Sequence, residues 1–247
     1  MKTKPQKKIP ETNAIFEHVK VANAAADADP KVLRLSMDAK AKVKVGNLSR
    51  GGYDRRAQAP EADDHDTEWT DVLVPFGILN LQTDELTIFL GESAETPDFV
   101  VDCLTHWWAE NQQNYAEVTT LAINLDSGGA TRSNRTQFIK RLVLFARESG
   151  LTLELIYYPP YHSKYNPVER CWAALEQFWN GAILDSVETV LEWASRMMWK
   201  GFEPTVYYLK GTYEKGIKVD QQTLSEFRVD WHPSEDLPKW AIMIQPN

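Results

Sequence analysis

The sequence has little cysteine and no long apolar segment, and both absences narrow the classes of protein to which it can belong. Its two cysteines, Cys103 and Cys171, are too few for a cysteine-based metal site. Both fall among apolar residues of expected helices, which predicts buried free thiols and suits a reducing cytoplasm. No apolar run approaches the roughly 18 residues that cross a bilayer, and the basic N-terminus lacks the apolar core of a secretory signal. We therefore expect a cytoplasmic protein with no membrane partner.

The chain also lacks an excess of positive charge. Lysine and arginine number 27 against 35 aspartates and glutamates, which gives a net charge of −8 and a pI of about 5.2. A dedicated nucleic-acid-binding protein usually has a basic surface, so such a partner would require a local cluster of cations here. The hydrophobic fraction of 43%, with nine tryptophans, predicts a folded protein whose 247 residues suffice for one sizeable core.

Apolar segments of two different periods alternate along the chain. Strands are expected at 33–38, 73–81, 85–93, 121–125 and 151–158. Helices are expected at 97–113, 132–150, 166–181 and 185–200. The order of these elements is strand, strand, strand, helix, strand, helix, strand, helix. This order favours an α/β fold, in which helices cover the faces of a sheet.

The two ends of the chain differ from this central pattern. Residues 1–30 are a basic tail followed by one short helix, from Thr12 to about Asp27. Residues 31–200 hold the alternating strands and helices and are expected to form the main domain. Residues 201–247 are expected to be a C-terminal extension that packs on this domain and is irregular apart from one candidate strand. Within the main domain, the Gly- and charge-rich segment 47–69 predicts an exposed excursion.

Three acidic residues fall where expected strands and helices begin or end. Asp38 lies near the end of the first strand, Asp126 ends the fourth, and Glu169 lies in the first turn of a helix after the fifth. Functional sites of open α/β sheets gather at the carboxyl ends of the strands. If the first and fourth strands are parallel neighbours, their terminal aspartates meet side by side. The helix can then bring Glu169 to the same place.

A cluster of three carboxylates calls for a cation, because like charges raise the pKa of one another. Mg²⁺ or Mn²⁺ is the natural partner of a water-accessible site made only of oxygen ligands. Two such ions can activate a water molecule and stabilise the leaving oxygen of a phosphodiester. The three acids therefore suggest metal-dependent phosphoryl transfer, which requires no serine, cysteine or histidine nucleophile.

Each acid also has an ordinary structural interpretation. Asp126, before Ser-Gly-Gly, can end its strand in an Asx-turn, and Asp38 can be a solvent-facing strand residue. Glu169 can belong to a capping box, with Asn166 as N-cap and Pro167 as the first helical residue. These interpretations weaken jointly, because a single topology would make all three acids converge.

Three blocks of the sequence resemble the catalytic blocks of DDE transposases, in particular the mariner-like enzymes of bacterial insertion sequences. The blocks are SMDAK, INLDSGG and PPYHSKYNPVE, and they follow one another in the order of that family. The likeness is greater to the Rhodopirellula-type transposase DDE family, through DAKAKVKVGNLSRGG, VPFGIL and YYPPYHSKYNPVERCW. It continues through WNGAILDSVETVLEWA and YEKGIKV, and so covers the chain from about residue 12 almost to its end.

The resemblance implies a fold, a site and a partner. The fold would be ribonuclease-H-like, a mixed five-stranded sheet with helices on both faces, here followed by the C-terminal extension. Asp38, Asp126 and Glu169 would be the catalytic and metal-binding triad, holding two Mg²⁺ or Mn²⁺ ions. The partner would be DNA, both transposon ends and target, and the active form would be a homo-oligomer.

Two departures from the family pattern accompany the resemblance. The second block commonly reads Asp-Asn-Gly-Pro but here reads Asp126-Ser127-Gly128-Gly129, and the interval from Asp126 to Glu169 is longer than in mariner enzymes. In addition, only about 30 residues precede the first catalytic strand, where such transposases usually carry a helix-turn-helix region. We interpret this as a truncated copy, or as a catalytic half separated from its DNA-binding half.

Cationic side chains close to the three acids are the expected DNA contacts, since phosphate binding needs only local charge. They are Lys40, Lys42, Arg132, His162 and Lys164. A solvated strand face and hydrogen bonds within a loop are the alternative roles for these residues. The acidic run at 63–66 is interpreted as solvated rather than as a metal site, because it has no second histidine nearby.

The expected function is metal-dependent phosphodiester hydrolysis and strand transfer at the ends of an insertion sequence. Two alternatives are left open. One is an inactive transposase remnant that acts as an interaction or inhibitory protein. The other is a different ribonuclease-H-like nuclease.

Overall fold

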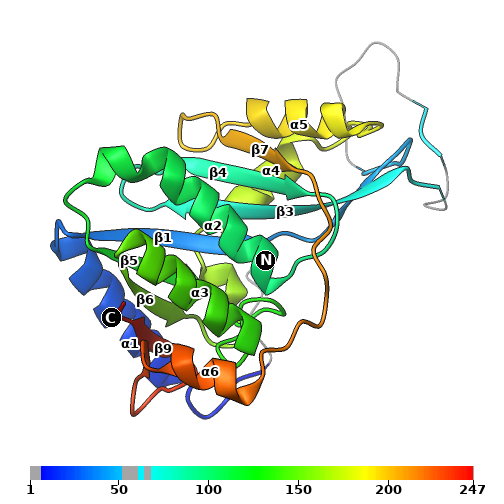
Figure 1. The fold of residues 1–247 in the computed structure, drawn as a ribbon. Helices are drawn as coiled ribbons and strands as arrows, with labels where there is room; N and C mark the ends of the chain where they lie inside the picture. The colour runs from blue at the N-terminus through cyan, green and yellow to red at the C-terminus, as the bar shows by residue number, and fades with distance from the viewer. Residues whose placement is uncertain (1–6, 52–60, 64–67, 247) are drawn as a thin grey trace.

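The computed structural model describes residues 7–51, 61–63 and 68–246, and within them one mixed sheet organises the chain (Figure 1). Its strands run in the order β7-β4-β3-β1-β5-β6-β9-β8, and β2 pairs with β3 beside this path. The strands are β1 (Val32–Ala39), β2 (Val43–Val45), β3 (Asp71–Asn80), β4 (Leu86–Gly91), β5 (Thr120–Leu125), β6 (Thr152–Tyr157), β7 (Thr205–Leu209), β8 (Trp231–Pro233) and β9 (Ala241–Ile244).

The expected five-stranded core is present as β4-β3-β1-β5-β6. In it β1 pairs antiparallel with β3 and parallel with β5, and β5 pairs parallel with β6. The C-terminal residues extend this core at both edges, because β7 pairs with β4 and β9 pairs with β6. The expected C-terminal extension thus contains three strands rather than one candidate strand, and they belong to the sheet itself.

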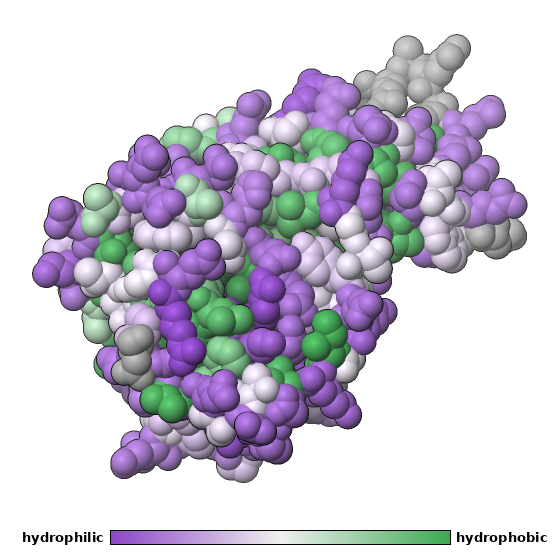
Figure 2. Space-filling view, in the orientation of Figure 1, coloured by the Kyte–Doolittle hydropathy of each residue, from purple (hydrophilic) through white to green (hydrophobic). Residues whose placement is uncertain are grey.

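Helices cover both faces of the sheet. They are α1 (Thr12–Ala28), α2 (Pro97–Asn111), α3 (Thr136–Ser149), α4 (Glu169–Phe178), α5 (Val187–Arg196) and α6 (Gln221–Arg228). The helices α2, α3 and α6 pack on one face, where their apolar side chains form a continuous cluster with β1, β5 and β6. Figure 2 shows this side of the molecule, on which hydrophilic side chains surround smaller apolar patches. None of the described helices is long and apolar enough to cross a membrane.

The opposite face carries two separate apolar clusters. One joins α4 and α5 to β3 and β4, and the other joins α1 to β5, β6 and β9. Between them β1 presents alternate polar residues: Arg34, Ser36 and Asp38 share one side of the strand, and Leu35 and Met37 point into the cluster on the other face. The face that α1 and α4 share is therefore divided by a polar stripe.

Local sequence explains the start of α2 and the end of α3. Thr96 caps α2 by accepting a hydrogen bond from the Phe99 N–H at 3.2 Å, as expected from its place before Pro97. Gly150 ends α3 in a left-handed conformation, with φ of 73°, which glycine adopts at low cost. Both free cysteines are buried, as expected.

Candidate active site

The sheet register brings Asp38 and Asp126 to the same level of two neighbouring parallel strands. The last paired residues are Ser36 of β1 and Asn124 of β5, and the offset between the strands is constant along the ladder. The next residue on the same face of each strand is Asp38 and Asp126, respectively. The expectation that these aspartates meet at the carboxyl ends of adjacent strands is therefore consistent with the register.

Asp38 lies in an electrostatically unfavourable position. Its side chain is 9% exposed, and burial raises its pKa to about 9, with further contributions from the negative charges of Asp126, Glu169 and Glu95. The N–H of Ala39 acts in the opposite direction but does not offset them. The other two polar residues of the stripe have partners, because Arg34 binds Asp27 and Ser36 binds Asn166. Asp38 instead faces other acids.

Asp126 sits in a tightly bonded turn at the end of β5. Its Oδ1 accepts a hydrogen bond from the Gly128 N–H at 3.0 Å, which is the Asx-turn considered from the sequence. Burial and the charge of Glu169 nevertheless raise its pKa. The backbone oxygen of Asp126 accepts from the Thr131 hydroxyl at 3.1 Å, and Tyr157 donates to the Thr131 carbonyl at 2.7 Å. Asp126 therefore both forms the Asx-turn and belongs to the group of acids, although this block departs from Asp-Asn-Gly-Pro.

Glu169 comes to the site on the first residue of α4. The alternative interpretation of Glu169 as part of a capping box is wrong: the N-cap position is Val168, and no side chain caps the helix. Asn166 instead faces β1, where its Oδ1 accepts from the Ser36 hydroxyl at 2.6 Å and its Nδ2 donates to the Met37 carbonyl at 3.0 Å. Glu169 is half-buried, and its charge acts on both aspartates.

A fourth acid, Glu95, was not predicted from the sequence. It precedes the N-cap of α2, and its side chain is exposed. Its pKa is raised because neighbouring protein atoms displace water from the carboxylate, and because of the charge of Asp126. The N–H of Ala130 and the cations Lys42 and Arg135 act in the opposite direction. Only the fold reveals this neighbour, because the start of α2 and the end of β5 are distant in sequence.

The donor chemistry of this cluster suits a hard divalent cation. Asp38, Asp126 and Glu169 offer only oxygen donors, and burial together with the charges of neighbouring acids raises the pKa of both aspartates, which a bound cation would oppose. Among the described residues, no group of three or more His, Cys, Asp or Glu side chains is already arranged to hold a metal ion. The cluster therefore fits the chemistry of Mg²⁺ or Mn²⁺, while its side chains would have to adjust on binding.

The expected DNA contacts have different environments. Lys40 is 10% exposed and pairs with Glu176, and His162 is buried beside Phe16 with its Nδ1 2.8 Å from the Pro160 carbonyl. Both side chains therefore have partners within the fold, and their contact with DNA stays a prediction. Lys42, Arg132 and Lys164 are exposed.

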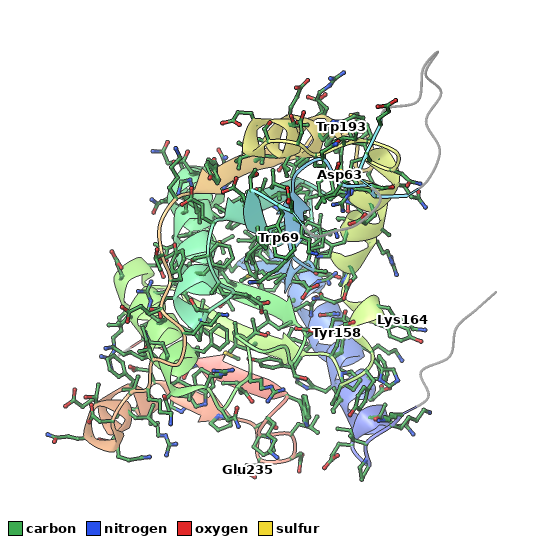
Figure 3. All side chains as sticks on the ribbon, turned by 90° about the vertical axis from the view of Figure 1, so that its right-hand side faces the viewer. Asp63, Trp69, Tyr158, Lys164, Trp193 and Glu235 are labelled. Carbon is green, nitrogen blue, oxygen red and sulfur yellow. The ribbon has the colours of Figure 1, made fainter. Side chains whose placement is uncertain are left out.

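Lys42 also lines a basic pocket that was not predicted from the sequence. This basic pocket has a volume of about 340 Å³ and is lined by Lys42, Lys44, Ser49 and Arg50, together with Gly46, Leu48 and Leu184. The ammonium of Lys44 lies 4.2 Å from the ring centre of Trp69, which is exposed. Figure 3 labels Trp69 near the middle of the view, Lys164 at its right and Glu235 at its lower end.

The acidic run at 63–66 is described only at its first residue. Asp63 accepts a hydrogen bond from the Asn47 side chain at 3.2 Å and bridges to Leu48. Residues 64–67 lie outside the described part of the chain.

Comparison with protein families identifies the chain. The sequence profile of the Rhodopirellula transposase DDE domain matches residues 1–246. The chain belongs to this transposase family. The resemblance seen in the three catalytic blocks is thereby confirmed over the whole chain, and DNA transposition is its context. No curated protein matches the sequence.

Solved structures of Mos1 transposase share the fold of this DDE domain. They are the Mos1 mariner paired-end complex with Mn (TM-score 0.52, 9% identity), the Mos1 paired-end complex with the left transposon end (0.51, 11%) and the Mos1 strand transfer complex (0.50, 10%). Each match covers 78% of this chain but only 55–56% of the Mos1 chain. The ribonuclease-H-like architecture is confirmed, and the chain spans little more than half the length of these structures.

Proposed function

We propose that this DDE domain catalyses metal-dependent phosphodiester hydrolysis and strand transfer at the ends of an insertion sequence, with Asp38, Asp126 and Glu169 as its catalytic residues. The observation that carries the proposal is the convergence of these three acids from β1, β5 and α4. Their mutual effect on pKa supports it, because each aspartate feels the charge of Glu169. Family membership supports the reaction class.

Two divalent cations, Mg²⁺ or Mn²⁺, would supply activation of a water molecule and stabilisation of the leaving oxygen. Asp38 and Asp126 would hold these cations from the ends of their strands. Glu169 would complete the site and assist removal of a proton from the attacking water. Hydrolysis breaks the bond between phosphorus and the 3′ oxygen, and leaves a 3′-hydroxyl and a 5′-phosphate. The same acids then serve the attack of that hydroxyl on a target phosphodiester, which displaces a new 3′-hydroxyl.

The DNA would reach the acids along the basic side of the domain. Lys42 connects the two regions, because it lines the basic pocket and its charge acts on Glu95 beside Asp126. Arg132 follows the second catalytic block, and Lys164 precedes the third. Phosphate contacts of this kind would position a duplex without reading its sequence. We further propose that the active form is a homo-oligomer. We also propose that it acts in the cytoplasm, where the buried thiols of Cys103 and Cys171 would stay reduced.

A cleavage assay with matched variants tests the proposed function. The substrate is DNA carrying the sequences that flank the gene, incubated with purified protein and either Mn²⁺ or EDTA. We expect nicking that requires Mn²⁺ and that falls about 100-fold or more in Asp126→Asn, since loss of a ligand exceeds the 10–100-fold effect of outer-shell partners. Glu235→Gln also removes one carboxylate, but from an exposed position, and should cleave as the wild type does.

The outcomes separate the proposed function from its alternatives. Equal nicking by Asp126→Asn and wild type would overturn the assignment of the triad. Mn²⁺ binding without cleavage of any DNA would favour the non-catalytic remnant. Preferential cleavage of RNA–DNA hybrids would favour a different nuclease of the same fold.

A further inference from the structure

Two polar residues from distant parts of the chain form a buried hydrogen-bonded pair next to the catalytic acids. Ser36 and Asn166 are both fully buried. The Ser36 hydroxyl donates to Asn166 Oδ1 at 2.6 Å and accepts from the Val168 N–H at 3.0 Å. Asn166 also donates from Nδ2 to the Met37 carbonyl at 3.0 Å. These three bonds connect β1 to the chain just before α4.

The bonded backbone groups are immediate neighbours of two catalytic acids. Met37 precedes Asp38, and Val168 precedes Glu169. The three bonds thus join the two segments at the positions directly before their carboxylates. Loss of these hydrogen bonds would move Glu169 relative to Asp38, because each bonded backbone group belongs to the residue directly before the acid.

The side chain of Asn166 bonds to β1 and does not cap α4. An asparagine at the start of a helix normally caps it by accepting a hydrogen bond from a backbone N–H of the first turn. Here α4 has no side-chain cap, and both polar groups of Asn166 bond to β1. Asn166 lies over the polar stripe of β1, between the two apolar clusters of this face, and so it meets a polar partner there. Among the described residues, no apolar cluster contains residues of both α4 and β1, whereas these hydrogen bonds join β1 to the segment before α4.

Close packing of α4 on β3 reinforces the same placement. Gly77 of β3 pairs with Asp38 in the register. A Cβ atom added at Gly77 would lie 2.7 Å from Trp172 Cζ2 and 3.0 Å from Val168 Cγ2. The absence of a side chain at Gly77 lets the first turn of α4 lie directly against the sheet beside Asp38.

We propose that Ser36 and Asn166 are positioning residues that set the separation of Asp38 and Glu169, and thereby the affinity of the site for divalent cations. This inference rests on the proposed function for its metal, but the hydrogen bonds that carry it are observed independently. Neither residue touches the cation. Each acts through the carboxylate next to its bonded backbone group, as outer-shell partners do at metal sites.

Metal titration of four proteins tests the proposal: wild type, Ser36→Ala, Asn166→Ala and Ser186→Ala. Ser186→Ala is the control for stability, because it removes the N-cap of α5, where the Ser186 hydroxyl accepts from the Thr189 N–H at 3.1 Å. Isothermal titration with Mn²⁺ should show about tenfold weaker binding for Ser36→Ala and for Asn166→Ala. Ser186→Ala should lower the melting temperature but bind Mn²⁺ as the wild type does.

A second measurement does not depend on metal. Hydrogen exchange of the metal-free proteins should show faster exchange across residues 161–170 in Ser36→Ala and Asn166→Ala, and unchanged exchange there in Ser186→Ala. The conservative variant Ser36→Thr keeps the hydroxyl and should restore part of the wild-type Mn²⁺ affinity. The double variant should bind Mn²⁺ no more weakly than the weaker single one, because both residues act through one connection.

The results distinguish two kinds of failure. Wild-type Mn²⁺ affinity in Ser36→Ala and Asn166→Ala would overturn the positioning role while leaving the triad intact. Unchanged exchange over residues 161–170 would overturn it as well, whether or not metal binds. A wild-type chain that binds Mn²⁺ no better than Asp126→Asn would instead overturn the proposed function, and with it the effect of Ser36 and Asn166 on metal affinity.

Discussion

At the scale of a single residue, the charge of Asp38 lowers the stability of the folded chain. The side chain is nearly buried, and its neighbours are acids, so its charged form is disfavoured in the folded chain and not in the unfolded one. Its pKa is therefore raised on folding. Stability is lost as pH rises above the unfolded pKa, about 4, because the unfolded chain then releases a proton that the folded chain retains until about pH 9.

Replacing Asp38 by asparagine should stabilise the metal-free protein. Asparagine keeps the shape and removes the charge, and we expect a gain of about 2 kcal/mol at pH 8, or roughly 4–8 °C in melting temperature. The gain should shrink towards pH 4, where Asp38 becomes protonated in the unfolded chain as well as in the folded one. Differential scanning calorimetry in EDTA between pH 4 and pH 8 measures it.

Mn²⁺ provides the control for this prediction. It should raise the melting temperature of the wild type and leave that of Asp38→Asn almost unchanged, because binding to the folded state stabilises it. Glu235→Gln should behave as the wild type in both media. An Asp38→Asn protein that is less stable than the wild type at pH 8 would show that Asp38 has a structural role.

At the scale of elements, α1 supports the loop that carries the third catalytic block. The Phe16 ring packs edge-on against the rings of His162 and Tyr165, with centroid distances of 5.3 and 5.1 Å. His162 precedes the short 3₁₀ helix Ser163–Tyr165, and Tyr165 is its last residue, directly before Asn166. The loop before Glu169 is thus held by α1 on one side and by β1 on the other.

Removing the Phe16 ring should loosen this loop. We expect Phe16→Ala to lose about 2 kcal/mol of stability, less than for a fully buried phenylalanine because Phe16 is half-buried. Hydrogen exchange should increase over residues 161–166. Val21→Ala is the control on the same helix, since Val21 is 59% exposed, and it should change stability by less than about 0.5 kcal/mol. Similar exchange in both variants would mean that α1 does not restrain the loop.

The elements also show what sequence periodicity can and cannot predict. It gave α1, the β3–β4 hairpin and the caps of α2 and α3, because these depend on residues close in sequence. It missed β7 and β8 and gave β9 only as a candidate strand outside the main domain, since short strands near sheet edges gain their stability from partners far along the chain. It also placed the N-cap of α4 two residues early, at Asn166 instead of Val168, because the Asn166 side chain forms hydrogen bonds with β1 and does not cap the helix.

The same division applies to the candidate site. Asp38, Asp126 and Glu169 were predictable because each ends or begins an element within a motif that resembles a known family. Glu95 and Ser36 were not, because only the packed fold brings them to the acids. The pairing of Lys40 with Glu176 was equally hidden, since these residues lie on different elements.

At the scale of the whole molecule, the net charge of −8 conceals an uneven distribution. Lys42, Lys44 and Arg50 line the basic pocket, and Lys42 adjoins the acidic site. Arg50 shares Glu176 with Lys40, so two cations there face one carboxylate. A chain repelled by DNA overall can still bind it here, because phosphate contacts depend on charge within about 10 Å at moderate salt.

The salt dependence of DNA binding should locate this contact surface. If Lys42 and Lys44 each neutralise one phosphate, the double variant Lys42→Ala/Lys44→Ala should reduce the slope of log K against log salt by about 2. The control is Lys20→Ala/Lys239→Ala, which removes the same charge from exposed positions on α1 and before β9. Fluorescence anisotropy with one duplex between 50 and 200 mM salt, in EDTA, measures both slopes without cleavage. Equal slopes in the two double variants would exclude the basic pocket as the DNA surface, whereas a reduced slope in the first alone would assign it, because both proteins carry the same net charge.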